Sequence, residues 1–290
     1  MSALAFALVL GSAFCHATWN LLLKRSKHKV AFLPAFGAVS FVLFLVPAVV
    51  FAVVDGIDLA GVGFGLGSAL IHGVYGYTLA RGYQLGDLST VYPISRGLGP
   101  ALIPIAAVLL LNETVSSGAA AGIGLVVVGI VVIQGEGFAP NELFRPLVLL
   151  RRPEVRSALL TGTLIATYSI WDKASLEHLP PVTLNQFAMT GHMLLLLPFA
   201  LRGAPSPFEQ EWRERPLSII AAGILAPLAY ILVLVALTTT RISYVAPTRE
   251  IGIVLGALLG VLLLREGYGV FRIGGSVLIV LGVFVIALAP

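Results

Sequence analysis

Ten long apolar runs constrain this chain more than any other feature of its sequence. Each run has about 17–25 residues, the length that an α-helix needs to cross the hydrocarbon core of a bilayer. The runs are near-continuous rather than alternating, which excludes a transmembrane β-barrel. We therefore expect an all-α, polytopic membrane protein with ten transmembrane helices. The runs cover residues 3–23, 31–54, 59–80, 89–111, 116–133, 157–173, 182–201, 218–237, 242–264 and 273–288.

The composition indicates the same class of protein. Hydrophobic residues make up 58% of the 290 residues and charged residues only 11%, with a mean hydropathy of +0.98. Soluble domains average roughly 45–50% apolar and about 25% charged residues. A soluble enzyme, a disordered chain and a disulfide scaffold are thereby excluded. The single cysteine, Cys15, allows no intrachain disulfide.

The connections between runs are short, apart from a basic linker at residues 135–156 that contains four arginines. This linker separates a first five-helix repeat, residues 1–134, from a second, residues 157–290. The loops after odd-numbered runs hold most of the Lys and Arg residues, whereas those after even-numbered runs hold only Lys173 and Arg241. The positive-inside rule therefore predicts that both termini lie outside the cell. The basic residues are expected to contact lipid headgroups, and no nucleic-acid partner is expected.

The two halves match each other at a shift of 153 residues. Matches of Leu and Val are expected by chance in membrane sequences, so the matches of Arg, Glu and Gly are the informative ones. Since each half has an odd number of runs, the second enters the membrane with the opposite polarity, which makes an inverted repeat. In such transporters the substrate site lies near the bilayer midplane, where the repeats meet. The matched pairs are Arg96 and Arg249, Gly99 and Gly252, Glu113 and Glu266, Gly122 and Gly275, and Gly129 and Gly282.

Arg96 and Arg249 are the sharpest candidate site residues. Each lies about seven residues inside its run, and an arginine within hydrocarbon costs at least ~2.5–3.5 kcal/mol on insertion scales. One reason for this placement is recognition, because a guanidinium pairs with carboxylate or phosphate. The alternatives are a structural ion pair, with Glu250 or Asp172 as the partner, or an arginine that reaches a nearby membrane surface.

A second correspondence, at a shift of 152 residues, links the first run to the sixth. In each triplet the spacing is i, i+3, i+4, which places its members on one helix face. We expect the triplets to form two aromatic and polar walls of one pocket, the alternative being aromatic anchoring at the membrane surfaces. The triplets are His16, Trp19 and Asn20, and Tyr168, Trp171 and Asp172.

Further polar residues within the runs complete the candidate site. Tyr75 and Tyr92 would add stacking surface, and Asp172 or Glu250 could accept a substrate ammonium group. His72 is a candidate for proton coupling, with a hydrogen-bonded packing histidine as the alternative. Glu113 and Glu266 are expected to bond to loop amides or basic neighbours. No metalloprotease, serine-hydrolase or P-loop motif occurs, so we expect neither catalysis nor a bound metal or other cofactor.

These features resemble the EamA family of the drug/metabolite transporter superfamily. The resemblance covers the whole chain, because each half has an early tryptophan, a Leu run ending in Glu, and a glycine-rich last run. It implies an inner-membrane carrier with a cavity lined by spans one, three, four, six, eight and nine. It also implies termini in the cytoplasm, opposite to the orientation that the loop charges predict.

The expected function is secondary transport of a small metabolite, namely an amino acid, another zwitterion or an organic anion, by alternating access. Export is the expected direction, and the plasma (inner) membrane is the expected location. The expected partners are the substrate and membrane lipid, with the chain acting as a monomer or homodimer. The alternative is an intramembrane enzyme or a flippase for lipid-linked substrates.

Overall fold

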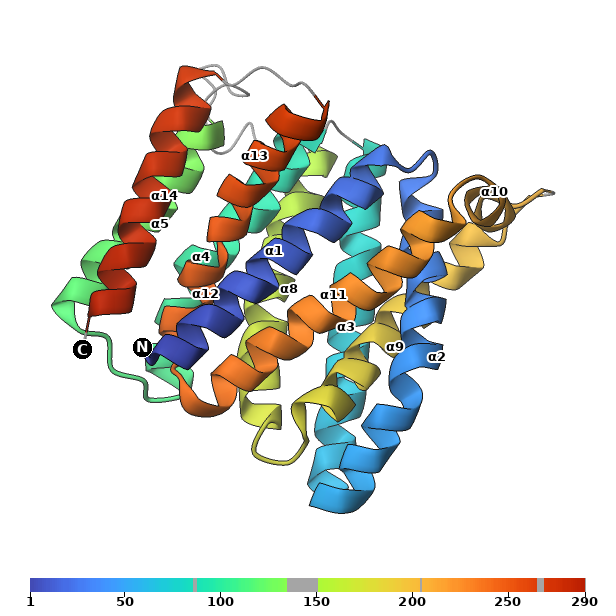
Figure 1. Ribbon diagram of the computed structural model, residues 1–290, viewed down its shortest axis with the longest axis horizontal. Coiled ribbons are helices and arrows are strands. Elements are labelled where there is room, and N and C mark those ends of the chain that lie inside the picture. The colour runs from blue at the N-terminus through green and yellow to red at the C-terminus, as the bar shows by residue number, and fades with distance from the viewer. Residues whose placement is uncertain (86–87, 135–150, 204, 265–268, 290) are drawn as a thin grey trace.

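The computed structural model describes residues 1–85, 88–134, 151–203, 205–264 and 269–289, and these residues are folded into helices and short connections (Figure 1). Each of the ten apolar runs coincides with helix, so the prediction of an all-α fold is confirmed. The helices are α1 (Ala3–Arg25), α2 (Lys29–Asp55), α3 (Leu59–Leu85), α4 (Leu88–Leu110), α5 (Ser117–Gln134), α8 (Pro153–Ser175), α9 (Pro181–Ala200), α10 (Pro207–Glu214), α11 (Pro216–Thr239), α12 (Ile242–Arg249), α13 (Ile251–Leu264) and α14 (Val270–Leu288).

Six helical segments in the described part of the chain are long and apolar enough to cross a membrane. Two more apolar segments, Ile94–Leu110 and Ser117–Ile133, are shorter. α8 and α9 are long but more polar, and several of their polar side chains are buried inside the protein. Large apolar side chains such as Val53 and Leu59 are exposed on the outer surface, as expected where helices face lipid.

The ninth apolar run is divided into two helices, whereas the sequence predicts one continuous span. The amide of Glu250 donates to the carbonyl of Pro247, one residue short of the α-helical spacing. Pro247 has no amide hydrogen and so weakens the helix just before this point. The division places Glu250 between α12 and α13, directly after Arg249.

The structure has a further helix, α10, between the seventh and eighth apolar runs, where the sequence predicts only a loop. This short helix begins with a capping box, in which the Ser206 hydroxyl accepts from the Glu209 amide and the Glu209 carboxylate accepts from the Ser206 amide. The Ser-x-x-Glu spacing is a local signal for a helix start. Helix α10 lies at the end of the bundle opposite the two chain ends, as does the connection from α1 to α2 (Figure 1).

The inverted repeat is visible in how α5 packs against α14. A Cβ added to Gly122 would lie 2.8 Å from the Gly282 carbonyl oxygen, and one added to Gly129 would lie 2.7 Å from that of Gly275. Gly275 and Gly282 are the repeat equivalents of Gly122 and Gly129, so each glycine meets the equivalent of the other. A two-fold relation between antiparallel helices requires this crosswise pattern. The matched glycines therefore pack α5 against α14 at a repeat interface.

The two repeats interlock rather than form separate halves. α1 packs against α11 and α13 of the second repeat and has little contact with its neighbour α2. Correspondingly, α8 packs against α3 and α4 of the first repeat. The interior between the repeats is therefore enclosed by helices from both.

Glu113 fixes one of these contacts between repeats. Its carboxylate accepts from the amides of Ile242 and Ser243 at 2.8 and 3.0 Å, and from the Ser243 hydroxyl at 2.6 Å. Glu113 thus bonds to backbone amides, but these belong to the first turn of α12 rather than to a loop as predicted, and the helix dipole favours an anion there. Its repeat equivalent, Glu266, lies outside the described residues, as does most of the basic linker.

Candidate functional site: a central cavity between the repeats

A central cavity of about 100 Å³ lies where the two repeats meet. Helices α1, α3, α4, α8, α11 and α12 contribute to its walls, as the resemblance implied, and α2 and α9 contribute as well. Most of the predicted site residues line it. These are His16, Trp19 and Asn20 of α1, His72 and Tyr75 of α3, Arg96 of α4, Tyr168 of α8 and Arg249 of α12.

The triplet of α1 lies together on the cavity wall, as its spacing predicts. The indole nitrogen of Trp19 donates to Nδ1 of His16 at 3.2 Å, and the Asn20 amide donates to the His16 carbonyl at 2.7 Å. The Trp19 ring also packs against Phe36 of α2, at 5.5 Å between centroids. This wall is therefore held by its own hydrogen bonds and presents aromatic surface to the cavity.

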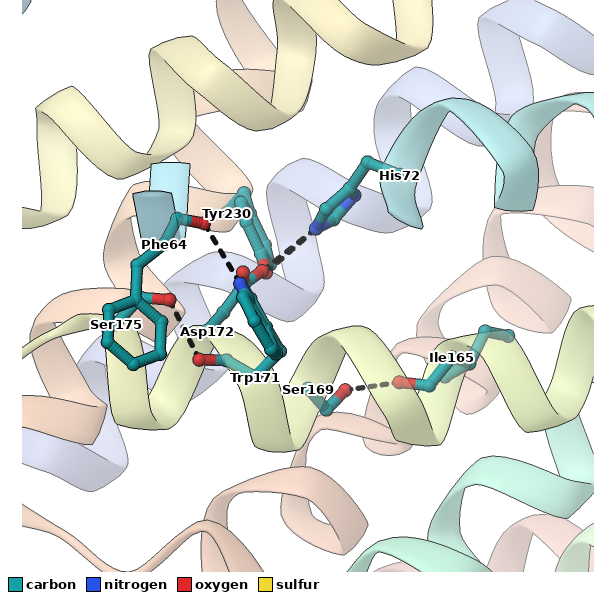
Figure 2. Close-up of polar contacts among 8 residues, drawn as sticks. All are labelled: Phe64, His72, Ile165, Ser169, Trp171, Asp172, Ser175 and Tyr230. Atoms are coloured by element: carbon teal, nitrogen blue, oxygen red, sulfur yellow. Dashed lines mark hydrogen bonds and ion pairs between the residues drawn. The ribbon is translucent and has the colours of Figure 1, made fainter. Parts of the chain in front are cut away.

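The triplet of α8 is not gathered on one wall. Tyr168 lines the cavity, whereas Trp171 is 36% exposed and donates its indole N–H to the Phe64 carbonyl at 2.9 Å (Figure 2). The Trp171 ring fills the space over Gly67, where an added Cβ would lie 2.4 Å away. The structure therefore places Trp171 in a contact between α8 and α3, outside the central cavity.

Asp172 lies behind the cavity wall in a fully buried cluster. Its Oδ2 lies 2.8 Å from Nε2 of His72 and accepts a hydrogen bond from the Tyr230 hydroxyl (Figure 2). Tyr230 and His72 both line the cavity, so they separate Asp172 from it. We call Asp172, His72 and Tyr230 the buried triad; its members come from α8, α3 and α11.

Aromatic rings continue from the buried triad across the cavity. Tyr168 packs on His72 with 4.2 Å between ring centroids, and Tyr75 meets Tyr168 at 5.4 Å and His192 at 6.0 Å. Tyr230 and His192 were absent from the sequence-predicted site. The signal that selected His72, a polar residue within an apolar run, also applies to both of them.

Arg96 and Glu250 form a buried ion pair that joins the repeats. Nη2 of Arg96 lies 3.1 Å from each carboxylate oxygen of Glu250, and the two side chains are 10% and 7% exposed. This arrangement is the structural ion pair that the sequence left open as an alternative. Both residues also line a smaller cavity of about 30 Å³ behind the central one.

Arg249 has different surroundings from its repeat equivalent. It lines both cavities, and among the described residues no carboxylate pairs with it and no hydrogen bond satisfies its buried Nε. The sequence explains this asymmetry, because the position equivalent to Glu250 in the first repeat is Gly97. Both repeats thus contain the arginine, but only the second contains the carboxylate, and that carboxylate pairs with Arg96.

No carboxylate is found among the described residues that line the central cavity. Asp172 and Glu250, the two residues expected to accept an ammonium group, are bound to His72 with Tyr230 and to Arg96, respectively. Tyr92 lies in α4, but its side chain is outside the described part. Within that part, no three His, Cys, Asp or Glu side chains cluster to hold a metal ion.

The chain was compared with models of known protein families, with curated proteins and with solved structures. The model of the EamA-like transporter family matches residues 3–135 and again residues 154–288. The chain is also similar to a solved structure described only as the crystal structure of a protein, with 19% identity and a TM-score of 0.74. That match covers 98% of this chain and 97% of the other, and at this identity it shows a shared fold. No curated protein matches the chain.

Proposed function

The chain belongs to the EamA-like transporter family, and from this premise we propose that it is a secondary transporter for a small organic anion. In this proposal ten helical spans cross the plasma (inner) membrane, and the central cavity holds the substrate. The repeats exchange access between the two membrane faces around that cavity, as in other inverted-repeat carriers. Export is the proposed direction.

The observation that carries the proposal is the state of Arg249. A guanidinium in a low-dielectric cavity is costly unless an anion pairs with it, and no carboxylate among the described residues does so. A substrate carboxylate or phosphate would supply the missing partner through charge-assisted hydrogen bonds. Arg96, in contrast, already contacts Glu250.

The remainder of the cavity supports a substrate with an apolar or aromatic part. Trp19, Phe36, Tyr75 and Tyr168 provide aromatic surface. Because Asp172 and Glu250 are both engaged, the cavity offers no carboxylate among its described lining residues to an ammonium group. These features favour an organic anion over a zwitterion or a cation of the same shape.

For the coupling ion we propose a proton bound at the buried triad. A proton shared between His72 and Asp172 would change the charge of a cluster that links α3 of one repeat to α8 and α11 of the other. The groups that face His72 are Asp172 and Tyr168 of α8, Tyr230 of α11, Tyr75 of α3 and, beyond Tyr75, His192 of α9.

The test uses three probes with a common phenyl-alkyl skeleton: 3-phenylpropanoate as the anion, L-phenylalanine as the zwitterion and 2-phenylethylamine as the cation. Uptake of each is measured in proteoliposomes with the wild-type protein and with Arg249→Gln. Arg213→Gln is the matched control, because it removes the same charge from an exposed position on α10.

We expect the wild type to transport 3-phenylpropanoate best, and Arg249→Gln to lose that transport about tenfold or more, as for a broken charge-assisted contact. The control should transport like the wild type. Equal 3-phenylpropanoate transport by Arg249→Gln and the wild type would contradict the proposal, as would a preference for the cation.

A further inference from the structure

A second and larger hollow opens at the end of the bundle that carries α10. Its volume is about 550 Å³, and it is bounded by α2, α3, α9 and the connections at their ends. Four cationic side chains line it, and no Asp or Glu is found among its described lining residues. We call this hollow the vestibule and define it by Lys27, Lys29, Arg81 and Arg202.

The cations of the vestibule come from three separate parts of the chain. Lys27 and Lys29 lie where α1 passes into α2, Arg81 lies in the last turns of α3, and Arg202 follows the end of α9. Sequence-distant charges of one sign thus converge on one concave surface. Like charges repel each other in such a place, so their convergence favours occupation by an anion.

The cations are largely available to a ligand. Within the described part of the chain, neither Lys29 nor Arg81 has a hydrogen-bond or ion-pair partner. Lys27 reaches Glu214 at 3.4 Å, with both side chains exposed, and Arg202 lies over the Phe199 ring at 5.0 Å. An exposed pair of this kind is weak and exchanges readily with a bound anion.

The vestibule adjoins the central cavity. Lys29, Val30 and Ala80 line both spaces, so the wall between them is formed by the same side chains. The other described cation of the central cavity without a carboxylate partner is Arg249. Lys29 therefore lies in the wall that the vestibule shares with the cavity proposed to hold the substrate.

We infer that the vestibule is a binding site for an oxyanion group, a carboxylate or a phosphate, which it concentrates at the entrance to the central cavity. The inference rests on the proposed function, because it takes the central cavity to be the site to which the anion moves next. The loop charges predict that this end of the bundle lies in the cytoplasm, whereas the family resemblance implies the opposite orientation. Positive-inside topology alone accounts for basic residues at this end, but it does not require them to surround one hollow.

The experiment separates the vestibule from the central cavity by using Arg249→Gln as the background. In that background, Arg81→Gln with Arg202→Gln removes two vestibule cations. Arg213→Gln with Arg215→Gln is the control, because it removes the same charge at the same end from residues outside the vestibule lining. Arg81→Lys with Arg202→Lys restores the charge and tests for loss through misfolding.

Two probes distinguish the sources of the oxyanion: inorganic phosphate, and phosphatidylglycerol compared with phosphatidylcholine. Binding is measured from the shift of the thermal unfolding midpoint with probe concentration, at constant ionic strength. We expect the glutamine double variant to bind about fivefold more weakly, since each exposed charge contact is worth little alone. The control and the lysine variant should bind like the background.

A loss confined to phosphate would identify a soluble anion as the ligand, and a loss confined to phosphatidylglycerol would identify a lipid headgroup. Both outcomes support an oxyanion site. Equal binding by the glutamine variant and the control, with both probes, would overturn it. Failure of the proposed function is seen separately, as 3-phenylpropanoate transport that does not depend on Arg249.

Discussion

Arg96 of the first repeat donates to both carboxylate oxygens of Glu250 in the second, at 3.1 Å each. Glu250 also marks the division between α12 and α13. The ion pair therefore connects α4 to the helical span that is interrupted at Glu250. Because Gly97 occupies the equivalent position in the first repeat, Arg249 has no matching pair. Arg96 is thus held in an ion pair between the repeats, and Arg249 is the arginine that we propose to bind the substrate anion.

Replacing Glu250 by Gln should destabilise the protein strongly. The substitution keeps the size of the side chain but leaves the buried Arg96 guanidinium without its carboxylate. Breaking one side of a buried pair costs about 3–5 kcal/mol. Reversible unfolding in detergent measures this loss.

The comparison variant is Arg249→Gln, which should change the free energy of unfolding by less than about 1 kcal/mol, since it breaks no pair with a described carboxylate. The reverse order of effects would contradict the assignment.

Much of the fold could be predicted from the sequence because its signals are local or repeated. Apolar runs give the helices, and the shift of 153 residues gives the two-fold relation that the contacts of Gly122 and Gly129 display. Glu113 also bonds to backbone amides, although they belong to the first turn of α12 and not to a loop as predicted. In each case the signal is a residue type at a given position along the chain, which is recognisable without the tertiary structure.

The pairing of polar side chains could not be predicted in this way. The spacing of Tyr168, Trp171 and Asp172 places them near one helix face, but it does not reveal that Gly67 leaves space for the Trp171 ring on another helix. Similarly, the choice between Glu250 and Asp172 as the partner of Arg96 depends on how α4, α8 and α12 cross. Both features depend on how side chains of different helices are placed in space, and a single sequence does not give those distances.

Replacing His72 by Gln should uncouple transport from the proton gradient. Glutamine can hydrogen-bond to Asp172 but cannot bind a proton as imidazole does. We expect accumulation of 3-phenylpropanoate under an imposed pH gradient to disappear, while exchange without a gradient continues. Both are measured in the same proteoliposomes. Tyr230→Phe is the comparison, because it removes a hydrogen bond from Asp172 and leaves His72 in place. Gradient-driven accumulation by His72→Gln at the wild-type level would exclude the buried triad as the coupling site.

Replacing Asp58 by Asn should lower stability at neutral pH and have less effect in acid. The Gly61 amide donates to the Asp58 carboxylate at 2.6 Å, and His178 lies 3.2 Å away. These contacts lower the pKa of Asp58 from its ordinary value of 3.8, the Gly61 hydrogen bond being the larger cause. A lowered pKa in the folded state stabilises the protein above the ordinary value, and this contribution is lost as the pH falls through the folded value.

The unfolding midpoints of the wild type and Asp58→Asn should therefore converge as the pH is lowered from 7 toward 3, below the ordinary pKa of 3.8. Asp55→Asn is a suitable control at the same connection, because Asp55 is exposed and accepts no hydrogen bond within the described residues. A difference between wild type and Asp58→Asn that stays constant with pH would show that the charge of Asp58 contributes nothing.

Replacing Gly122 by Ala should separate α5 from α14, whereas Gly124→Ala in the same helix should not. A Cβ at Gly122 would lie 2.8 Å from the Gly282 carbonyl oxygen and 3.0 Å from the Ile286 amide nitrogen, and backbone atoms cannot move aside cheaply. Overpacking of this kind costs about 1–3 kcal/mol. Nothing lies within 4 Å of a Cβ at Gly124, so alanine there should be neutral or stabilise the helix by up to about 1 kcal/mol.

The two-fold relation between α5 and α14 adds a sharper requirement. Gly275 is the repeat equivalent of Gly122, and its Cβ would lie 2.5 Å from the Gly129 carbonyl oxygen. Gly275→Ala should therefore lower the unfolding free energy by an amount similar to Gly122→Ala, and a large difference between these two variants would mean that the interface is not symmetric in energy.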